Sequence, residues 1–150
     1  MSEYTRRQTL TFGAAAFLSG GLLTAAPTFA ANDTADVVKA FLAGREPVKG
    51  KITLDLPEIA ENGNTVPLGV LVDSPMTAQS HVSEIVVLAE GNPNSAVVRF
   101  GLTPASGKAE ISVRIRLAAT QNVVVLARTS DGEVYMEKKS VKVTVAGCGG

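Results

Sequence analysis

The chain has 150 residues, of which 14 are Lys or Arg and 14 are Asp or Glu, so its formal net charge is zero. This balance argues against a protein that binds nucleic acid or an acidic membrane through a basic surface. Hydrophobic residues make up 45% of the chain, which is enough to build a folded core. The single Cys excludes an intramolecular disulfide, and with a single His it excludes a zinc or blue-copper site built mainly from thiolate and imidazole. We therefore expect no metal site and no cofactor.

Residues 1–30 have the composition of an export signal. Arg6 and Arg7 precede a run without charged residues over 8–32, which is rich in Gly and Ala and ends in small residues. The paired arginines favour the twin-arginine route and its Tat machinery, with cleavage after Ala30 and a periplasmic location. An uncleaved membrane anchor is the alternative, because about 20 apolar residues span a bilayer. The glycines and the small residues at the end of the run favour the signal.

The first element expected after the signal is a short helix over 33–44. Asp33 or Thr34 is a suitable N-cap, and Gly44 is a suitable stop. Apolar residues recur on one side of this helix, so we expect that side to lie against the rest of the domain. These residues are Val37, Val38, Phe41 and Leu42.

The remaining segments up to residue 145 alternate with the period of β-strands. Apolar and polar residues alternate most clearly over 109–117, which predicts a strand with one buried and one solvated face. Ile85 to Ala89 is continuously apolar, as in a strand buried on both faces. Asp131-Gly132 is typical of a two-residue type I′ hairpin turn. The predicted strands cover 52–56, 66–72, 85–89, 98–102, 109–117, 123–129 and 134–145.

This pattern of about seven strands joined by short polar turns predicts an all-β fold, an immunoglobulin-like antiparallel β-sandwich over 31–145. The chain has no Trp and no pair of cysteines. The likeness to antibody domains is therefore one of architecture only. A small β-barrel is the alternative.

The last predicted strand leads into a glycine-rich arm over 146–150, formed by Ala146, Gly147, Cys148, Gly149 and Gly150. Glycines leave the backbone free to move, so we expect the thiol to lie on a flexible tether. A nucleophilic cysteine instead needs a rigid place beside a base. No Lys, Arg or His adjoins Cys148 to lower the pKa of its thiol. The arm therefore favours a covalent carrier rather than an enzyme.

The tail, together with several internal stretches, resembles the SoxY family of sulfur-carrier subunits from the bacterial Sox thiosulfate-oxidation system. The family motif is Gly-Gly-Cys-Gly-Gly, and Ala146 replaces its first Gly here. The supporting stretches are residues 61–67, 72–76, 92–94 and 114–117.

The resemblance implies that the Cys148 sulfur holds the substrate covalently. A c-type cytochrome would join thiosulfate to it, a hydrolase would release sulfate, and a sulfane dehydrogenase would act on the sulfur that remains. The implied partner is a SoxZ-like β-sandwich subunit, exported together with this chain as a heterodimer.

Other interpretations remain open from the sequence. The chain could be an exported immunoglobulin-like binding module in which Cys148 has no role. A terminal Gly-Gly is also found on ubiquitin-like conjugation tails, but the export signal speaks against that class. A cupredoxin copper site is excluded because only glycines follow the Cys. His81 is expected to be an ordinary loop residue, while Arg114 and Arg116 form either a solvated face or a contact with SoxZ or with an anionic adduct.

Overall fold

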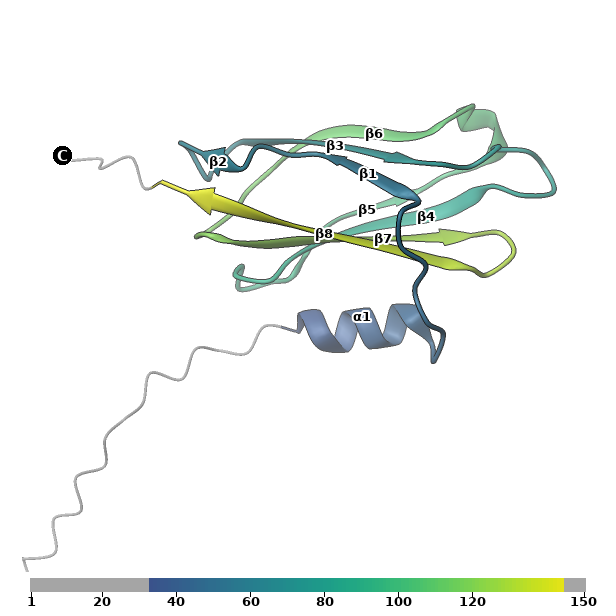
Figure 1. The fold of residues 1–150 in the computed structure, drawn as a ribbon, viewed down its shortest axis with the longest axis horizontal. Coiled ribbons are helices and arrows are strands. Elements are labelled where there is room, and N and C mark those ends of the chain that lie inside the picture. Colours follow the sequence, from purple (N-terminus) through teal and green to yellow (C-terminus); the bar gives the residue numbers. More distant parts are fainter. Residues whose placement is uncertain (1–32, 145–150) are drawn as a thin grey trace, which may run out of the picture.

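A computed structural model describes residues 33–144, which form two stacked β-sheets with a single α-helix on the outside (Figure 1). This is the predicted immunoglobulin-like all-β sandwich. The elements are α1 (Thr34–Leu42), β1 (Ile52–Asp55), β2 (Ile59–Ala60), β3 (Val66–Val72), β4 (Val82–Ala89), β5 (Ala96–Gly101), the 3₁₀ turn η1 (Pro104–Ser106), β6 (Ala109–Ile115), β7 (Gln121–Thr129) and β8 (Val134–Val143).

The sheets contain three and five strands. The three-stranded sheet has the order β1-β3-β6, and the five-stranded sheet has the order β2-β8-β7-β4-β5. Neighbouring strands are antiparallel except for β2, which runs parallel to β8. Every predicted strand is present. The sequence did not predict β2, because its two residues are too few to show any alternation.

The central strands of the five-stranded sheet are buried on both faces, which confirms the expectation for 85–89. In β4, Val87 packs between the two sheets, whereas Val86 and Leu88 belong to a second apolar cluster on the outer face. All three side chains are fully buried. The continuous apolar run therefore reflects two separate cores, one on each side of the strand.

Helix α1 supplies the cover for that outer face, as its apolar side predicts. Phe41 is buried there, with Val37, Val38 and Leu42 packed around it. The sheet side of this cluster consists of Val86, Leu88, Val124, Leu126, Val134 and Met136. Within residues 33–144, α1 is too short and too polar to span a membrane.

Both ends of α1 are attached to the sheet by side chains. At the first end, Asp33 occupies the N-cap position but makes no capping hydrogen bond. Its carboxylate instead accepts hydrogen bonds from the backbone and the hydroxyl of the buried Ser95. The hydroxyl bond, followed by the backbone bond, holds the pKa of Asp33 below its usual value. Asp33, one of the two predicted N-cap residues, therefore holds that position, but its carboxylate connects α1 to the loop before β5 instead of capping the helix.

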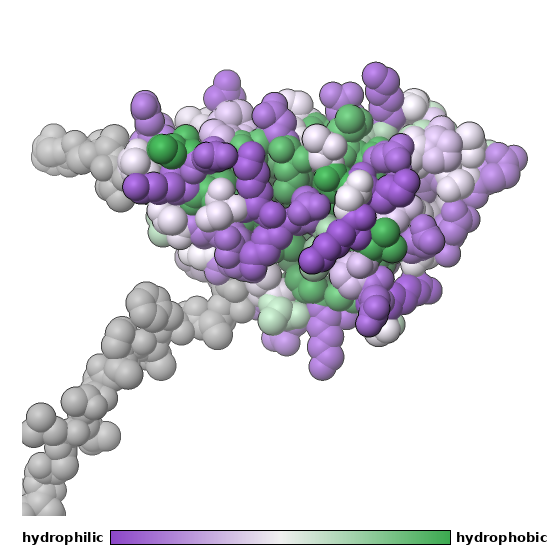
Figure 2. All heavy atoms as spheres, in the orientation of Figure 1, coloured by the Kyte–Doolittle hydropathy of each residue, from purple (hydrophilic) through white to green (hydrophobic). Residues whose placement is uncertain are grey.

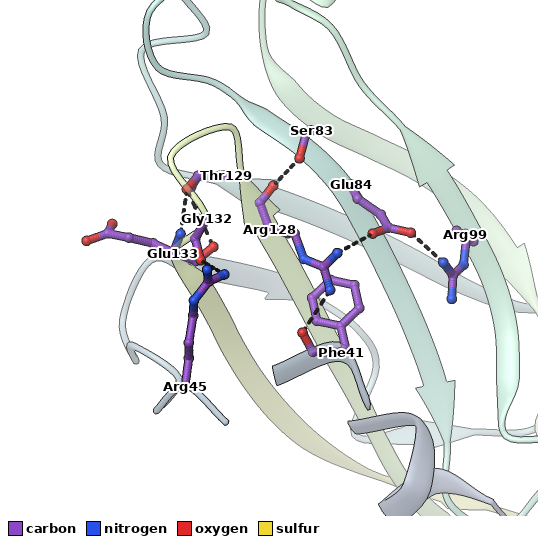
Figure 3. Close-up of polar contacts among 9 residues, drawn as sticks. All are labelled: Phe41, Arg45, Ser83, Glu84, Arg99, Arg128, Thr129, Gly132 and Glu133. Atoms are coloured by element: carbon purple, nitrogen blue, oxygen red, sulfur yellow. Dashed lines mark hydrogen bonds and ion pairs between the residues drawn. The ribbon is translucent and has the colours of Figure 1, made fainter. Parts of the chain in front are cut away.

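At the other end of α1, Arg128 of β7 lies over the Phe41 ring, with its guanidinium carbon 4.2 Å from the ring centre (Figure 3). The same guanidinium donates to the Phe41 carbonyl at 2.8 Å. The Glu84 carboxylate forms an ion pair with Arg128 at 3.7 Å and another with Arg99 at 2.6 Å. These contacts fix the end of α1 over β7 and β4 (Figure 3).

The hairpin between β7 and β8 differs from the predicted type I′ turn. Gly132 has a φ of 87°, but Asp131 is not among the residues with positive φ, as a type I′ turn would require. The Gly132 amide donates to the Thr129 carbonyl at 3.0 Å, and the Thr129 amide donates to the Glu133 carbonyl at 3.0 Å. The loop therefore spans residues 130–132, with its glycine in the left-handed position that such loops need.

Candidate functional site

The predicted carrier residue Cys148 and the arm residues Ala146, Gly147, Gly149 and Gly150 lie outside the described residues, as do Arg6 and Arg7 of the predicted signal. The division into 1–30, 31–145 and 146–150 stays a prediction for the same reason. The structure does show the platform from which the tail starts. That platform is the end of β8 together with the loops around it (Figure 1).

The last residues of β8 are held along both edges. On the β2 side, the Lys142 amide donates to the Glu58 carbonyl at 2.8 Å, and the Thr144 amide donates to the Ala60 carbonyl at 3.0 Å. On the other side, Val143 extends beyond the ladder with β7, whose last pair is Gln121 with Val141. The strand end therefore needs a different partner on that side.

Thr120 is that partner. Its hydroxyl accepts the Val143 amide at 3.0 Å and donates to the Val143 carbonyl at 3.3 Å. One side chain thus satisfies both backbone groups of Val143, as a neighbouring strand would. With Thr120 on one edge and β2 on the other, the chain is fixed as far as Thr144.

Gly63 lies directly beneath this strand end. A Cβ atom at Gly63 would come within 2.3 Å of the Leu117 carbonyl oxygen and 2.9 Å of Val143 Cγ1. The Leu117 amide also donates to the Gly63 carbonyl at 2.7 Å. Only a residue without a side chain fits here, so Gly63 has a packing role at the base of the tail.

A third loop, over 91–95, is bound to the same end of the sandwich by side-chain amides. Asn92 donates to the Arg116 carbonyl at 2.8 Å and accepts the Ala118 amide at 2.9 Å. Gln121, which is buried, donates to Asn92 at 3.0 Å and accepts the Gly91 amide at 2.6 Å. The loops after β4 and β6 are therefore held rigidly together.

These two loops enclose a hollow of about 330 Å³, which we call the Arg116 hollow. It is lined by Asn92, Pro93, Asn94, Arg116 and Ala118. The sequence placed Arg114 and Arg116 on one outward face of a single strand. Both are exposed and alternate with buried Ile115 and Leu117, but β6 ends at Ile115, so the two arginines have different surroundings. Arg114 donates to the Thr65 hydroxyl at 3.4 Å, whereas Arg116 lines the hollow.

A second hollow, of about 420 Å³, lies between the start of α1 and the outer face of β7 and β8. Glu90 lies at its rim and contacts Lys138 at 2.6 Å and Asn122 at 2.7 Å. Burial favours a higher pKa for Glu90, but the hydrogen bonds from Lys138 and Asn122 outweigh it and hold the pKa below its usual value. This group therefore ties β4, β7 and β8 together in its ionised form.

His81 has a structural place at the opposite end of the sandwich. Its ring nitrogen Nδ1 lies 3.2 Å from the Thr77 carbonyl, and its amide donates to the Ser130 hydroxyl at 3.2 Å. In residues 33–144, His, Asp and Glu side chains form no group of three that could hold a metal ion.

Sequence reasoning missed two residues at the base of the tail. Thr120 follows two alanines in a turn, and nothing local indicates that its hydroxyl meets β8. Asn92 lies in a stretch that the sequence predicts as a turn, but its side-chain contacts with the loop after β6 were not predicted. Its Asn-Pro-Asn sequence is typical of a turn, and that was the available signal for a structured loop.

Comparisons with known proteins agree with this fold. A structure of the sulfur carrier protein SoxY from Chlorobium limicola f. thiosulfatophilum is 31% identical, with a TM-score of 0.61, and the match covers 74% of this chain and 96% of that one. A superoxide reductase (neelaredoxin) from Ignicoccus hospitalis is 16% identical, with a TM-score of 0.56, over 63% of this chain and 81% of that one. This second likeness concerns the fold alone.

The comparison with curated protein sequences found no match. Among protein families, residues 38–148 match the family described as sulfur oxidation protein SoxY. The matched range includes all strands of the sandwich and extends to the cysteine of the tail. The chain therefore belongs to the SoxY family of sulfur-oxidation proteins.

Proposed function

We propose that this chain, a member of a family of sulfur carriers, works in the periplasm and holds its cargo as a covalent adduct on Cys148. The observation that carries the proposal is the mounting of the tail. The last described strand is held along both edges as far as Thr144, and Gly-Cys-Gly-Gly follows within a few residues. A fixed base with a glycine-rich end suits a thiol that must be presented to several different enzymes.

The chemistry proposed for Cys148 begins with an oxidation. The thiol and thiosulfate lose one proton and two electrons and form Cys-S-S-SO₃⁻. The electrons pass to a c-type cytochrome. A hydrolase then adds water to the terminal sulfone, which leaves as sulfate with a proton, and Cys-S-SH remains. A sulfane dehydrogenase oxidises this remaining sulfur. The carrier supplies only the thiol, so the catalytic groups belong to the partner enzymes.

Membership of the SoxY family supports a role for the chain in the Sox system, and we propose SoxZ as its partner. We propose that the two subunits form a heterodimer and that residues 1–30 direct the folded pair through the Tat machinery. Three large hydrophobic side chains are exposed among the described residues, at Val48, Ile59 and Leu71. On the face drawn in Figure 2, hydrophobic surface lies in separate spots between hydrophilic side chains.

The direct test is Cys148→Ser in cells that grow on thiosulfate. We expect sulfate formation from thiosulfate to stop, because serine cannot form the disulfide-type bond. Intact-mass analysis of the complex purified from the periplasm should show adducts on the wild type that reductant removes, and none on the variant. Ala146→Gly, which restores the family motif, is the matched control and should keep both the adducts and the activity. Continued thiosulfate oxidation by Cys148→Ser would favour the binding-module alternative.

A further inference from the structure

We propose that the Arg116 hollow receives the anionic adduct carried on Cys148, with the Arg116 guanidinium as its counter-charge. This inference rests on the proposed function. It adds a resting site for the cargo on the carrier itself, between visits to the partner enzymes.

The walls of the Arg116 hollow are held in place by hydrogen bonds between side chains and backbone. The Asn92 side chain bridges its two walls through the Arg116 carbonyl and the Ala118 amide. Gln121, buried behind it, holds Asn92 and the Gly91 amide in place. The walls therefore keep their separation without a ligand, and an occupant does not have to order them.

The charge of the hollow is that of a single arginine. Among the arginines of residues 33–144, Arg116 is the one whose guanidinium makes no hydrogen bond or ion pair within the described part of the chain. The others are engaged: Arg45 with Gly132, Arg99 and Arg128 with Glu84, and Arg114 with Thr65. Within residues 33–144, neither Asp nor Glu is among the residues that line the hollow. An anion that enters it therefore meets a positive charge that no lining residue of this range neutralises.

The base of the tail lies at the same end of the sandwich. Leu117, next to Arg116, contacts Gly63 beneath Val143, and Thr120 binds Val143 directly. Two residue steps from Ala118 to Thr120, plus the contact with Val143, put the hollow within about 12 Å of the end of β8. Cys148 is the fourth residue after Thr144, so its Cα can lie up to about 14 Å away. The adduct can therefore reach the hollow.

The chemistry of the cargo suits this site. A guanidinium donates two parallel hydrogen bonds to an oxyanion, and a sulfonate offers three oxygens in a compact group. The Asn94 side chain at the rim adds a neutral amide donor. Tethering supplies the cargo at an effective concentration in the millimolar range, so a weak site is sufficient. Once sulfate has been released, the shorter persulfide has no sulfonate for Arg116, and the arm leaves the hollow.

The experiment uses the complex of this chain with SoxZ, and the adduct on Cys148 is formed chemically, without the partner enzymes. Tetrathionate converts the thiolate to Cys-S-S-SO₃⁻ and releases thiosulfate, so both sulfur and charge balance. Amide NMR signals of Asn94 and Ala118 should shift on loading. Arg116→Gln should abolish these shifts and make removal of the adduct by added thiol about three- to five-fold faster. Arg114→Gln is the matched control, with the same loss of charge outside the hollow, and should behave as the wild type.

Three results would overturn the inference. One is loading that leaves the Asn94 and Ala118 signals unchanged, and another is equal behaviour of the two arginine variants. The third is tight binding of free thiosulfate at the hollow in Cys148→Ser protein, because the site would then serve free substrate rather than tethered cargo. None of these outcomes depends on enzyme turnover. A failed resting site is therefore distinguishable from a failed carrier function, which the growth of the Cys148→Ser strain tests.

Discussion

The two sheets of this sandwich are covered differently. The five-stranded sheet has the inter-sheet core on one side and α1 on the other, so its central strands β4 and β7 are buried on both faces. The three-stranded sheet shares the inter-sheet core, but its outer face is exposed, and its strands β3 and β6 alternate between buried and exposed residues. β8, which carries the tail, belongs to the doubly covered sheet.

This difference indicates that the five-stranded sheet is the support for the tail. A strand embedded between two apolar layers opens only at a large cost in free energy, whereas a sheet with a solvated face tolerates change on that face. The described chain therefore ends on a strand of the doubly covered sheet. The predictions below test this contrast, from the largest expected effect to the smallest.

The outer core beneath α1 gives the strongest test. Leu126 of β7 is 0% exposed there, while Leu71 of β3, on the outer face of the three-stranded sheet, is 44% exposed. We expect Leu126→Ala to lower the free energy of unfolding by about 3 kcal/mol, because it opens a cavity under the helix. The same truncation at Leu71 should cost less than about 1 kcal/mol. Equal losses in urea unfolding would contradict the contrast between the sheets.

The second test concerns the packing of Gly63 between the two sheets, at the base of the tail. Gly63→Ala places a Cβ against Leu117 and Val143, so we expect the free energy of unfolding to fall by about 2 kcal/mol. Gly101→Ala in the edge strand β5 is the control, because a Cβ there meets nothing within 4 Å. If the two variants unfold at the same denaturant concentration, Gly63 has no packing role at the base.

A local test concerns Thr120. Thr120→Val keeps the shape of the side chain but removes the hydroxyl that binds Val143. We expect amide hydrogen exchange at Val143 to become about ten-fold faster, as for the loss of one hydrogen bond. Amides in the middle of β8 should be unaffected. Thr120→Ser, which keeps the hydroxyl, should retain most of the protection; if it exchanges as fast as the valine variant, another contact holds the strand end.

The smallest effect is a dependence on pH. The pKa of Glu90 is held below the ordinary value of 4.5, so its ionised form adds stability above that pH. This contribution is lost as the pH falls below about 4.5 and the carboxylate takes up its proton. Glu90→Gln should therefore lower the free energy of unfolding by a few tenths of a kcal/mol near neutral pH, and the difference should vanish in acid.

The control for Glu90 is Asp73→Asn on the side of the three-stranded sheet. Asp73 pairs with Lys51 at 3.0 Å, and both side chains are more exposed than Glu90. We expect its substitution to change the free energy of unfolding less than Glu90→Gln does. A larger effect of Asp73→Asn, measured by denaturant unfolding at matched pH, would argue against the contrast.

Much of the fold follows from local pattern. Alternation over 109–117 and the apolar run 85–89 each predict a strand with the correct number of buried faces, because burial is repeated along the strand itself. The apolar side of α1 was predictable for the same reason. β2 was not, since its two residues become a strand only through pairing with β8, more than eighty positions later.

In the candidate site too, the features that depend on local sequence were predictable, and those that depend on distant segments were not. A cysteine between glycines is visible in the sequence, and so is an Asn-Gly turn at 62–63. The Arg116 hollow joins loops that are distant in sequence, and sheet pairing brings them together. The turn at 130–132 shows the limit for short signals. Asp-Gly suits both a two-residue and a three-residue hairpin loop, and the backbone chosen depends on how the flanking strands meet.

The hydrogen bonds along both edges of β8 also have a mechanical consequence. In the carrier function proposed above, a partner enzyme that takes up the tail would pull on Thr144 along the axis of the strand. The hydrogen bonds to β7, to β2 and to Thr120 run across that axis, so the pull loads them together in shear instead of peeling them apart one at a time. A pull on Thr144 therefore leaves the shape of the sandwich behind it unchanged.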